Sequence, residues 1–230
     1  MQGIITRWIA CRLANHADTG AKEHGYQIFQ ALSQQSSLRS SAGWFFEAYT
    51  HDWLRKGGTF EADRLSHKDS LQVLTFDLNP ENSREARYFT TPGHLANQLK
   101  NRCGQGVDPW MIGIYFQPRC RTQESFDSLM VTSIESRDTL VLFQITMATT
   151  HAVKTGGVRE ILQALPKTIQ QVFIIFVVPE DRVDNYHLPQ KAPAADELTN
   201  GRYEYKIKQF RLVFPDDDLL SIAVPKPRIL

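Results

Sequence analysis

The stretch from Val172 to Pro179, VFIIFVVP, constrains the fold more than any other part of the sequence. It is apolar throughout, which is typical of a central strand of a parallel sheet covered by helices on both faces. A membrane span needs roughly 18 or more apolar residues, so neither this stretch nor any shorter apolar run predicts one. Apolar residues make up 42% of the chain, enough for a sizeable core. The chain is therefore expected to be an α/β protein without a membrane partner.

The segments before this stretch predict how the central strand is connected. Leu140 to Thr146 has the composition of a strand, and a helical pattern runs from about Val153 to Leu165. A strand–helix–strand order indicates a crossover between parallel strands. Ser125 to Thr132 is a further predicted strand, which forms a hairpin with Leu140 to Thr146 if the two are antiparallel neighbours. Further helices are expected over about 22–34, 42–56 and 91–102, and further strands over 71–77, 111–116 and 203–214, with a loop over 79–87.

The length of 230 residues suits one large domain with an extra arm. We expect residues 1–40 to form an N-terminal helical arm and residues 41–230 to form the α/β domain. Arg7 and Arg12 interrupt the apolar residues at the N-terminus, so no signal-peptide core forms, and an intracellular protein is expected. This segment is either a short amphipathic helix or the remnant of a longer protein with an upstream module.

Composition and missing motifs exclude several classes of protein. The net charge of +1 argues against a polybasic or histone-like role, so any nucleic acid would have to meet a local basic patch. Cys11, Cys103 and Cys120 are widely spaced, which predicts reduced thiols rather than a zinc site. The sequence contains no P-loop, no His-Glu-x-x-His and no Gly-x-Ser-x-Gly.

Two polar residues in neighbouring strands carry the strongest chemical signal. Asp127 lies within an apolar strand, where a carboxylate is costly unless it is paired, hydrogen-bonded or bound to metal. Gln144 and Thr146 share one face of the next strand, because strand side chains alternate. If the two strands are antiparallel neighbours, Asp127 and Gln144 converge and can share one cation. Oxygen ligands of this kind suit Mg²⁺.

This arrangement resembles the signature of PD-(D/E)XK nucleases, which have a restriction-endonuclease-like fold: a strand Asp, a short hairpin, then an acidic residue or Gln, any residue, and Lys. The resemblance implies a mixed central sheet flanked by helices, and carboxylates that hold Mg²⁺ or Mn²⁺. It also implies a lysine that activates the attacking water. Many of these enzymes carry a further Glu in the helix before the sheet, and Glu47 is the matching residue.

An ordered series of short motifs resembles, more narrowly, the C-terminal domain of Crinkler and RHS-type proteins. In that family an NTPase module commonly precedes the nuclease-like domain, and members are described as effectors or selfish-element proteins that act on nuclear DNA. The resemblance therefore implies DNA as a partner and a nuclear target. The motifs are GWFFEA at 43–48, GGTF at 57–60, YFQP at 115–118, FDS at 126–128, FQITM at 143–147 followed by His151, and FVVP at 176–179.

The sequence departs from the nuclease signature at Thr146, which stands where the lysine is expected and carries no charge. Lys154, near the start of the following helix, and His151 are candidates to replace it. Arg119, Arg121 and Lys154 could hold phosphates. The expected function is metal-dependent hydrolysis of phosphodiesters in DNA. The alternative is a catalytically inactive module of the same fold that binds DNA or a protein partner.

Each candidate residue also has a purely structural interpretation. Glu47 would pair with Arg55 or Arg87, and Asp127 would cap a bulge or bind a backbone amide. Gln144 would be a hydrogen-bonded core amide, His151 a helix-entry residue and Lys154 a solvated lysine of a first helical turn. The aromatic residues of 42–56 are expected in the core, and scattered surface charges are an equally good interpretation of the arginines.

Overall fold

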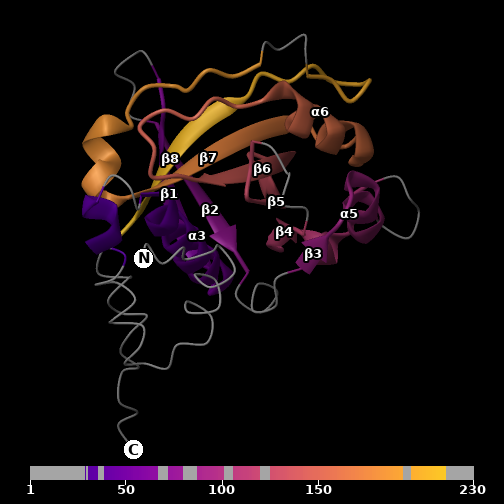
Figure 1. Ribbon diagram of the computed structural model, residues 1–230. Coiled ribbons are helices and arrows are strands. Elements are labelled where there is room, and N and C mark those ends of the chain that lie inside the picture. The colour runs from indigo at the N-terminus through magenta and orange to yellow at the C-terminus, as the bar shows by residue number, and fades with distance from the viewer. Residues whose placement is uncertain are drawn as a thin grey trace, which may run out of the picture.

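A computed structural model of the chain (Figure 1) describes residues 29, 31–35, 39–66, 72–79, 87–100, 106–119, 125–193 and 198–215. Most of the expected arm lies outside these residues, as do Arg121 and the three cysteines. Helical residues are present at 29 and 31–34, within the first helix expected from the sequence. Among the described residues, no helix has both the length and the apolar character needed to span a bilayer.

The centre of the protein is an eight-stranded mixed sheet in the order β2-β1-β8-β7-β6-β5-β4-β3. β5 and β6 form an antiparallel hairpin, while β6, β7 and β8 run parallel to one another. The α/β class and the predicted parallel pairing are therefore confirmed, and the two hairpin strands are antiparallel neighbours. The strands are β1 (Gly58–Arg64), β2 (Val73–Leu78), β3 (Arg87–Phe89), β4 (Phe116–Pro118), β5 (Ser128–Ile134), β6 (Arg137–Ile145), β7 (Gln171–Pro179) and β8 (Lys208–Phe214).

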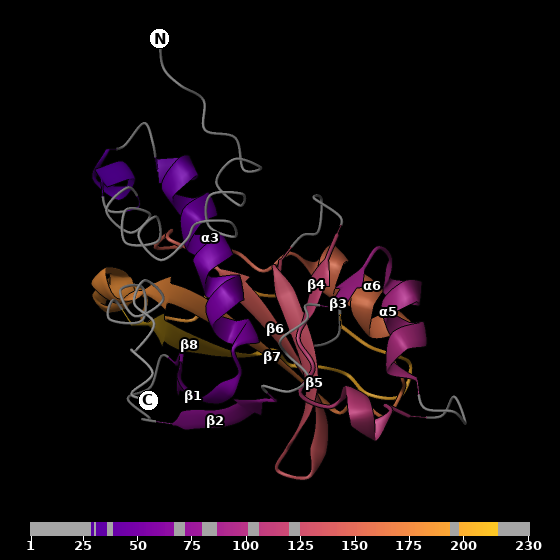
Figure 2. The same cartoon turned by 90° about the horizontal axis from the view of Figure 1, so that it is seen from below.

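Helices cover both faces of the sheet (Figure 2). Helix α3 (Arg39–Arg55) contributes Phe45 and Phe46 to one apolar cluster with every second residue of β6 and β7. Helices α5 (Pro92–Leu99) and α6 (Thr155–Ala164) contribute to the cluster on the other face. All nine residues of β7 are buried, which explains why its sequence is apolar without alternation.

The sheet is strongly curled around the cluster that contains α3. The ring centroids of Phe76 in β2 and Phe143 in β6 are 5.9 Å apart, although three strands separate β2 from β6 in the sheet. In a flat sheet the four steps would place these strands about 19 Å apart. Gly113 lies against this curled edge, since a Cβ at its position would be in ordinary contact with the backbone oxygen of Asp77 at 3.8 Å, and its φ of +76° favours glycine there.

Four expectations about secondary structure were wrong or incomplete. The strand expected over 111–116 is mostly absent, because Asp108 caps a 3-10 helix, η2 (Pro109–Met111), and only Phe116 begins β4. Within 203–214 the strand begins at Lys208. β1 and β3 were not predicted. β1 has only two buried side chains, Phe60 and Ala62, and β3 has three residues in a polar segment.

Candidate functional site

The hairpin brings Asp127 and Gln144 together at one end of the sheet. Asp127 directly precedes β5 and donates its backbone N–H to the oxygen of Phe143 at 2.8 Å. Its side-chain Oδ2 accepts hydrogen bonds from Gln144 Nε2 and from the backbone N–H of Ile145, both at 2.7 Å. Gln144 is buried, whereas Asp127 is partly exposed. The pair therefore forms one polar unit that reaches the surface through the carboxylate.

These hydrogen bonds agree with the structural interpretation of both residues. Asp127 does bind a backbone amide, and Gln144 is a hydrogen-bonded amide. As the side chain is oriented, Gln144 offers an N–H group to the carboxylate, so binding a cation would require its Oε1 to turn inward. Thr146 is also buried, and its Oγ1 accepts the N–H of Ala148 at 3.0 Å. Thr146, the position at which the resemblance leads one to expect a lysine, thus carries a hydroxyl with a local structural hydrogen bond.

Glu47 lies in α3, in a chain of polar groups that leads to a buried tyrosine. Glu47 Oε1 is 3.7 Å from His51 Nε2, one helical turn further on. The other ring nitrogen, His51 Nδ1, lies 2.7 Å from the hydroxyl of Tyr115, which is fully buried. Arg55 forms its ion pair with Asp52 at 3.1 Å. The sequence analysis missed His51 and Tyr115; the i, i+4 spacing of Glu47 and His51 was a usable signal for the first of them.

Tyr115 links this chain electrostatically to Asp127. Burial raises the pKa of the Tyr115 hydroxyl far above its ordinary value of 10.0. The negative charges of Asp127 and Glu47 raise this pKa further, while the positive charge of Arg55 lowers it. Both carboxylates therefore act on one phenol, which stays protonated at neutral pH. Glu47 and Asp127 lie on different elements, and the negative charge of each raises the pKa of the same buried hydroxyl.

Lys154 and His151 lie in the segment that leads into α6. The backbone N–H of Lys154 donates to Ser125 Oγ at 2.6 Å, and Ser125 is two residues before Asp127. This contact fixes the start of α6 at the Asp127 end of the sheet, with Lys154 exposed at the N-cap position. The backbone N–H of His151 donates to Gln190 Oε1 at 2.8 Å, so its described hydrogen bond leads away from Asp127.

His151 should make stability depend on pH. Burial, with a smaller contribution from the positive charge of Lys154, lowers the pKa of His151 below its ordinary 6.5. The unfolded chain then binds a proton more readily, so this contribution to stability is present above pH 6.5 and is lost as the pH falls through the lower folded value. We expect His151→Gln to flatten the decrease in the free energy of unfolding below pH 6.5.

Urea denaturation at a series of pH values measures this effect. His187→Gln is the matched control, because His187 is an exposed histidine in the neighbouring loop. An equal change in slope for the two variants would contradict the assignment to His151.

A basic and aromatic group lies on the β3–β4 side of this end of the sheet. The backbone N–H of Arg119 donates to the oxygen of Phe89 at 2.8 Å, just after β4. Its guanidinium lies 5.0 Å from the ring centroid of Tyr88, which is 42% exposed. β4 runs antiparallel to β5, so Arg119 extends toward the Asp127 end. Arg119, just after β4, and Lys154, just before α6, thus both lie at the Asp127 end of the sheet.

The side-chain oxygens at this site are of the type that binds a hard cation, but they are too few to surround one. Within the described part of the chain, no group of three or more His, Cys, Asp or Glu side chains could hold a metal ion. Asp127 and Gln144 offer one carboxylate and one amide, and Glu47 lies beside His51. Mg²⁺ keeps several waters and often uses only one or two protein carboxylates plus substrate phosphates, so this set fits Mg²⁺ better than a metal that needs a full protein cage.

Comparisons with protein-family models, with curated proteins and with solved structures found no match to this chain. Functional inference therefore depends on the geometry of the chain itself and on the resemblance in its short motifs.

Proposed function

We propose that the chain is a nuclease-like module that binds DNA at the Asp127 end of the sheet and hydrolyses a phosphodiester bond there with the help of Mg²⁺ or Mn²⁺. One observation carries the proposal: the antiparallel hairpin joins the Asp127 carboxylate to the Gln144 side chain at 2.7 Å, at a partly exposed position. This is the pairing that the PD-(D/E)XK signature requires of its strand Asp and of the residue two before its lysine. A restriction-endonuclease-like fold is part of the same proposal.

The charges around Asp127 suit a phosphodiester backbone. Arg119 follows β4, and Lys154 stands at the start of α6, where the positive end of the helix dipole adds to its charge. Contacts of this kind hold a backbone without reading its sequence. The net charge of +1 is compatible with such binding because the positive groups are local to one end of the sheet.

In this mechanism Asp127 and Gln144 would hold the cation, with Glu47 as a further carboxylate on α3, and Gln144 would turn its Oε1 toward the cation. When bound, the cation polarises the phosphate and lowers the pKa of a coordinated water. Lys154 stabilises the negative charge on the phosphate oxygens. His151 is neutral at pH 7 because its pKa is lowered, so it is suited to accept a proton rather than to supply a positive charge.

Supercoiled plasmid DNA provides the direct test. Purified protein with Mg²⁺ or Mn²⁺ should convert the supercoiled form to the nicked form, and EDTA should prevent the conversion. No nicking with either metal at high protein concentration would refute the hydrolase proposal.

A second function, DNA binding without hydrolysis, is favoured by the hydrogen bonds of Asp127. Its Oδ2 already accepts two N–H groups, and Thr146 supplies no charge. Under this alternative, Arg119 and Lys154 bind phosphates and the polar pair only stabilises the hairpin. Binding that needs no metal and weakens steeply with salt, together with intact plasmid, would support the alternative.

A Gln144→Glu variant should reveal whether this position can bind a cation. The new carboxylate would face Asp127 across a distance close to the present 2.7 Å. Without metal the two charges repel, so the melting temperature should fall. A divalent cation would neutralise the repulsion, so millimolar Mg²⁺ should raise the melting temperature of the variant more than that of the unmodified protein.

Thermal unfolding with Mg²⁺ and with EDTA measures the difference. Gln163→Glu adds the same charge at an exposed position near the end of α6 that lies opposite to Lys154, and serves as the matched control. An identical Mg²⁺ response in both variants would exclude a cation site at Asp127 and Gln144.

A further inference from the structure

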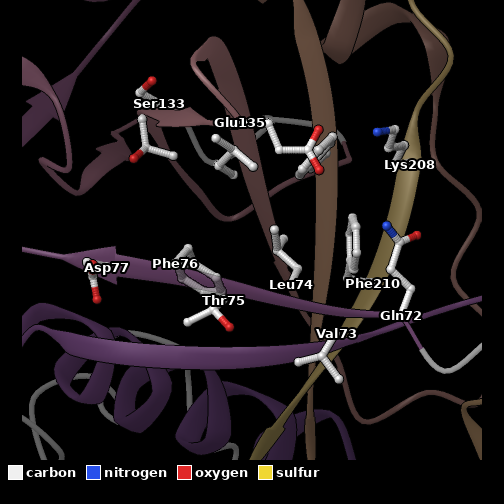
Figure 3. Close-up of a pocket in the computed structure, with 13 residues that line it drawn as sticks. Gln72, Val73, Leu74, Thr75, Phe76, Asp77, Ser133, Glu135, Lys208 and Phe210 are labelled. Carbon is white, nitrogen blue, oxygen red and sulfur yellow. The ribbon is translucent and has the colours of Figure 1, made fainter.

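A groove lies along β2, away from the site described above. A hollow of about 370 Å³ separates β2 from the far end of β5, at Thr132 to Glu135 (Figure 3). A second hollow of about 430 Å³ shares Asp77 and Thr132 with the first and continues to Gly113. Asp127 precedes the start of β5, whereas Glu135 follows its end, so the groove and the proposed hydrolase site lie at opposite ends of this strand. Volumes of this size are typical of ligand sites.

β2 presents an unpaired strand edge to this groove. β2 is the last strand of the described sheet and pairs only with β1 there. Consecutive residues from Gln72 to Asp77 line the hollow, so residues of both faces of the strand border it, as happens along an edge. The backbone N–H of Arg64 donates to the oxygen of Gln72 at 2.8 Å, which makes these two a hydrogen-bonded pair with β1.

This bond determines which backbone groups face the groove. Hydrogen-bonded and non-hydrogen-bonded pairs alternate along an antiparallel ladder. Val73, Thr75 and Asp77 are therefore in non-hydrogen-bonded pairs with β1, and their N–H and C=O groups point to the outer edge. Such a row of unpaired donors and acceptors is a template for another strand.

The walls of the groove combine an aromatic floor with a charged rim. The rings of Phe76, Phe173 and Phe210 line it. Figure 3 shows Ser133, Glu135 and Lys208 on the opposite side of the hollow from β2. The Lys208 ammonium lies 5.1 Å from the ring centroid of Phe173. Two acids, Asp77 and Glu135, accompany this one lysine, so the lining is net acidic.

We propose that this groove binds an extended peptide segment of another protein, which adds to the sheet as a strand beside β2. Backbone hydrogen bonds to Val73 and Thr75 would hold the segment, which would end before Asp77, because Gly113 already lies beside the backbone oxygen of Asp77. Alternate apolar side chains would pack on the aromatic floor, and basic side chains between them would meet Asp77 and Glu135. The part of β2 before Asp77 therefore sets the length over which the segment would pair with the sheet.

A proline at position 75 tests this mode of binding selectively. The N–H of Thr75 points outward, so Thr75→Pro removes a donor that β1 does not use, and proline is tolerated at such edge positions. Thr75→Val keeps the N–H and is the matched control. The probe is a capped, fluorescent seven-residue peptide of alternating valine and lysine, and fluorescence polarisation measures its binding. A second peptide carries N-methyl groups on alternate amides.

The probe should bind the Thr75→Val variant, and Thr75→Pro should weaken binding at least about tenfold, since a backbone hydrogen bond is lost and the proline ring obstructs the edge. N-methylation should weaken binding by a similar factor. Equal binding to both variants, equal binding of both peptides, or no binding of the probe to Thr75→Val would overturn the proposal. A dimer of Thr75→Val that Thr75→Pro converts to monomer in sedimentation would also overturn it, since a second copy would then occupy the edge.

Discussion

Replacing Asp127 by asparagine is expected to reduce metal-dependent plasmid nicking by on the order of 10²-fold or more. The carboxylate is the only charged group of the Asp127–Gln144 pair, so the variant loses the charge that would hold the cation. A catalytic metal contributes several kcal/mol to transition-state stabilisation, and each 1.36 kcal/mol corresponds to a factor of ten in rate. The measurement is the initial rate of nicking at saturating Mg²⁺.

Asparagine separates catalysis from folding at this position. Its side-chain oxygen can still accept the N–H of Ile145, which Asp127 Oδ2 accepts at 2.7 Å. Alanine would leave that N–H without its acceptor, at a cost of about 1–3 kcal/mol, and would leave Gln144 Nε2 only its long bond to the oxygen of Ile145 at 3.4 Å. The asparagine variant should therefore stay folded, as circular dichroism and urea denaturation would show.

Glu160→Gln, an exposed change on α6, controls for loss of one negative charge and for contaminating nuclease. If Asp127→Asn nicks plasmid as fast as Glu160→Gln, Asp127 has no catalytic role. If neither nicks plasmid but both bind DNA with the same salt dependence, the binding module without hydrolysis is the better description.

Replacing Phe143 by alanine should cause the largest loss of stability, about 3–5 kcal/mol. Phe143 is fully buried in β6. Its ring lies 5.9 Å from that of Phe76 and 5.9 Å from that of Tyr115, measured between centroids. It therefore holds the curled edge of the sheet and the buried tyrosine of the candidate site against the same strand. The loss would be measured by urea denaturation.

Trp110→Ala is the matched control, because this large aromatic side chain is 80% exposed. Its free energy of unfolding should change by less than about 0.5 kcal/mol. A similarly small loss for Phe143→Ala would mean that the curled edge does not depend on this side chain. Phe143→Ala should also lose binding of the probe peptide, because the groove is lined by β2 and depends on the position of that strand.

The burial, facing and pairing of the central strands could be predicted because short sequence patterns determine them. The apolar run of β7 indicated burial on both faces, and all nine of its residues are buried. Alternation in Leu140 to Thr146 indicated that Phe143 and Gln144 face opposite sides. The strand–helix–strand order predicted the parallel pair β6–β7. These inferences depend on neighbours within a few residues, where periodicity is a direct physical consequence of backbone geometry.

Elements with weak patterns were not predictable. β3 has three residues, and β1 has two buried side chains in seven residues. Such strands form because neighbouring strands supply hydrogen-bond partners for their backbone groups. These neighbouring strands include β8 for β1 and β4 for β3, which are distant in sequence. The 3-10 helix η2 replaced an expected strand because Asp108 caps Trp110 and Pro109 lacks an N–H.

The sequence by itself determined an α/β chain with a buried parallel core, and it marked Asp127 and Gln144 as polar residues in neighbouring strands. Only the tertiary structure decided that their side chains are bonded to each other, that Glu47 leads through His51 to the buried Tyr115, and that β2 borders a groove. The bond between Asp127 and Gln144 depends on side-chain orientation at one end of the β5–β6 hairpin. The groove depends on the curl of the sheet, which brings β2 and β6 together across three intervening strands. Contacts between segments so far apart in the chain depend on how the sheet closes around its core, and no local pattern encodes that closure.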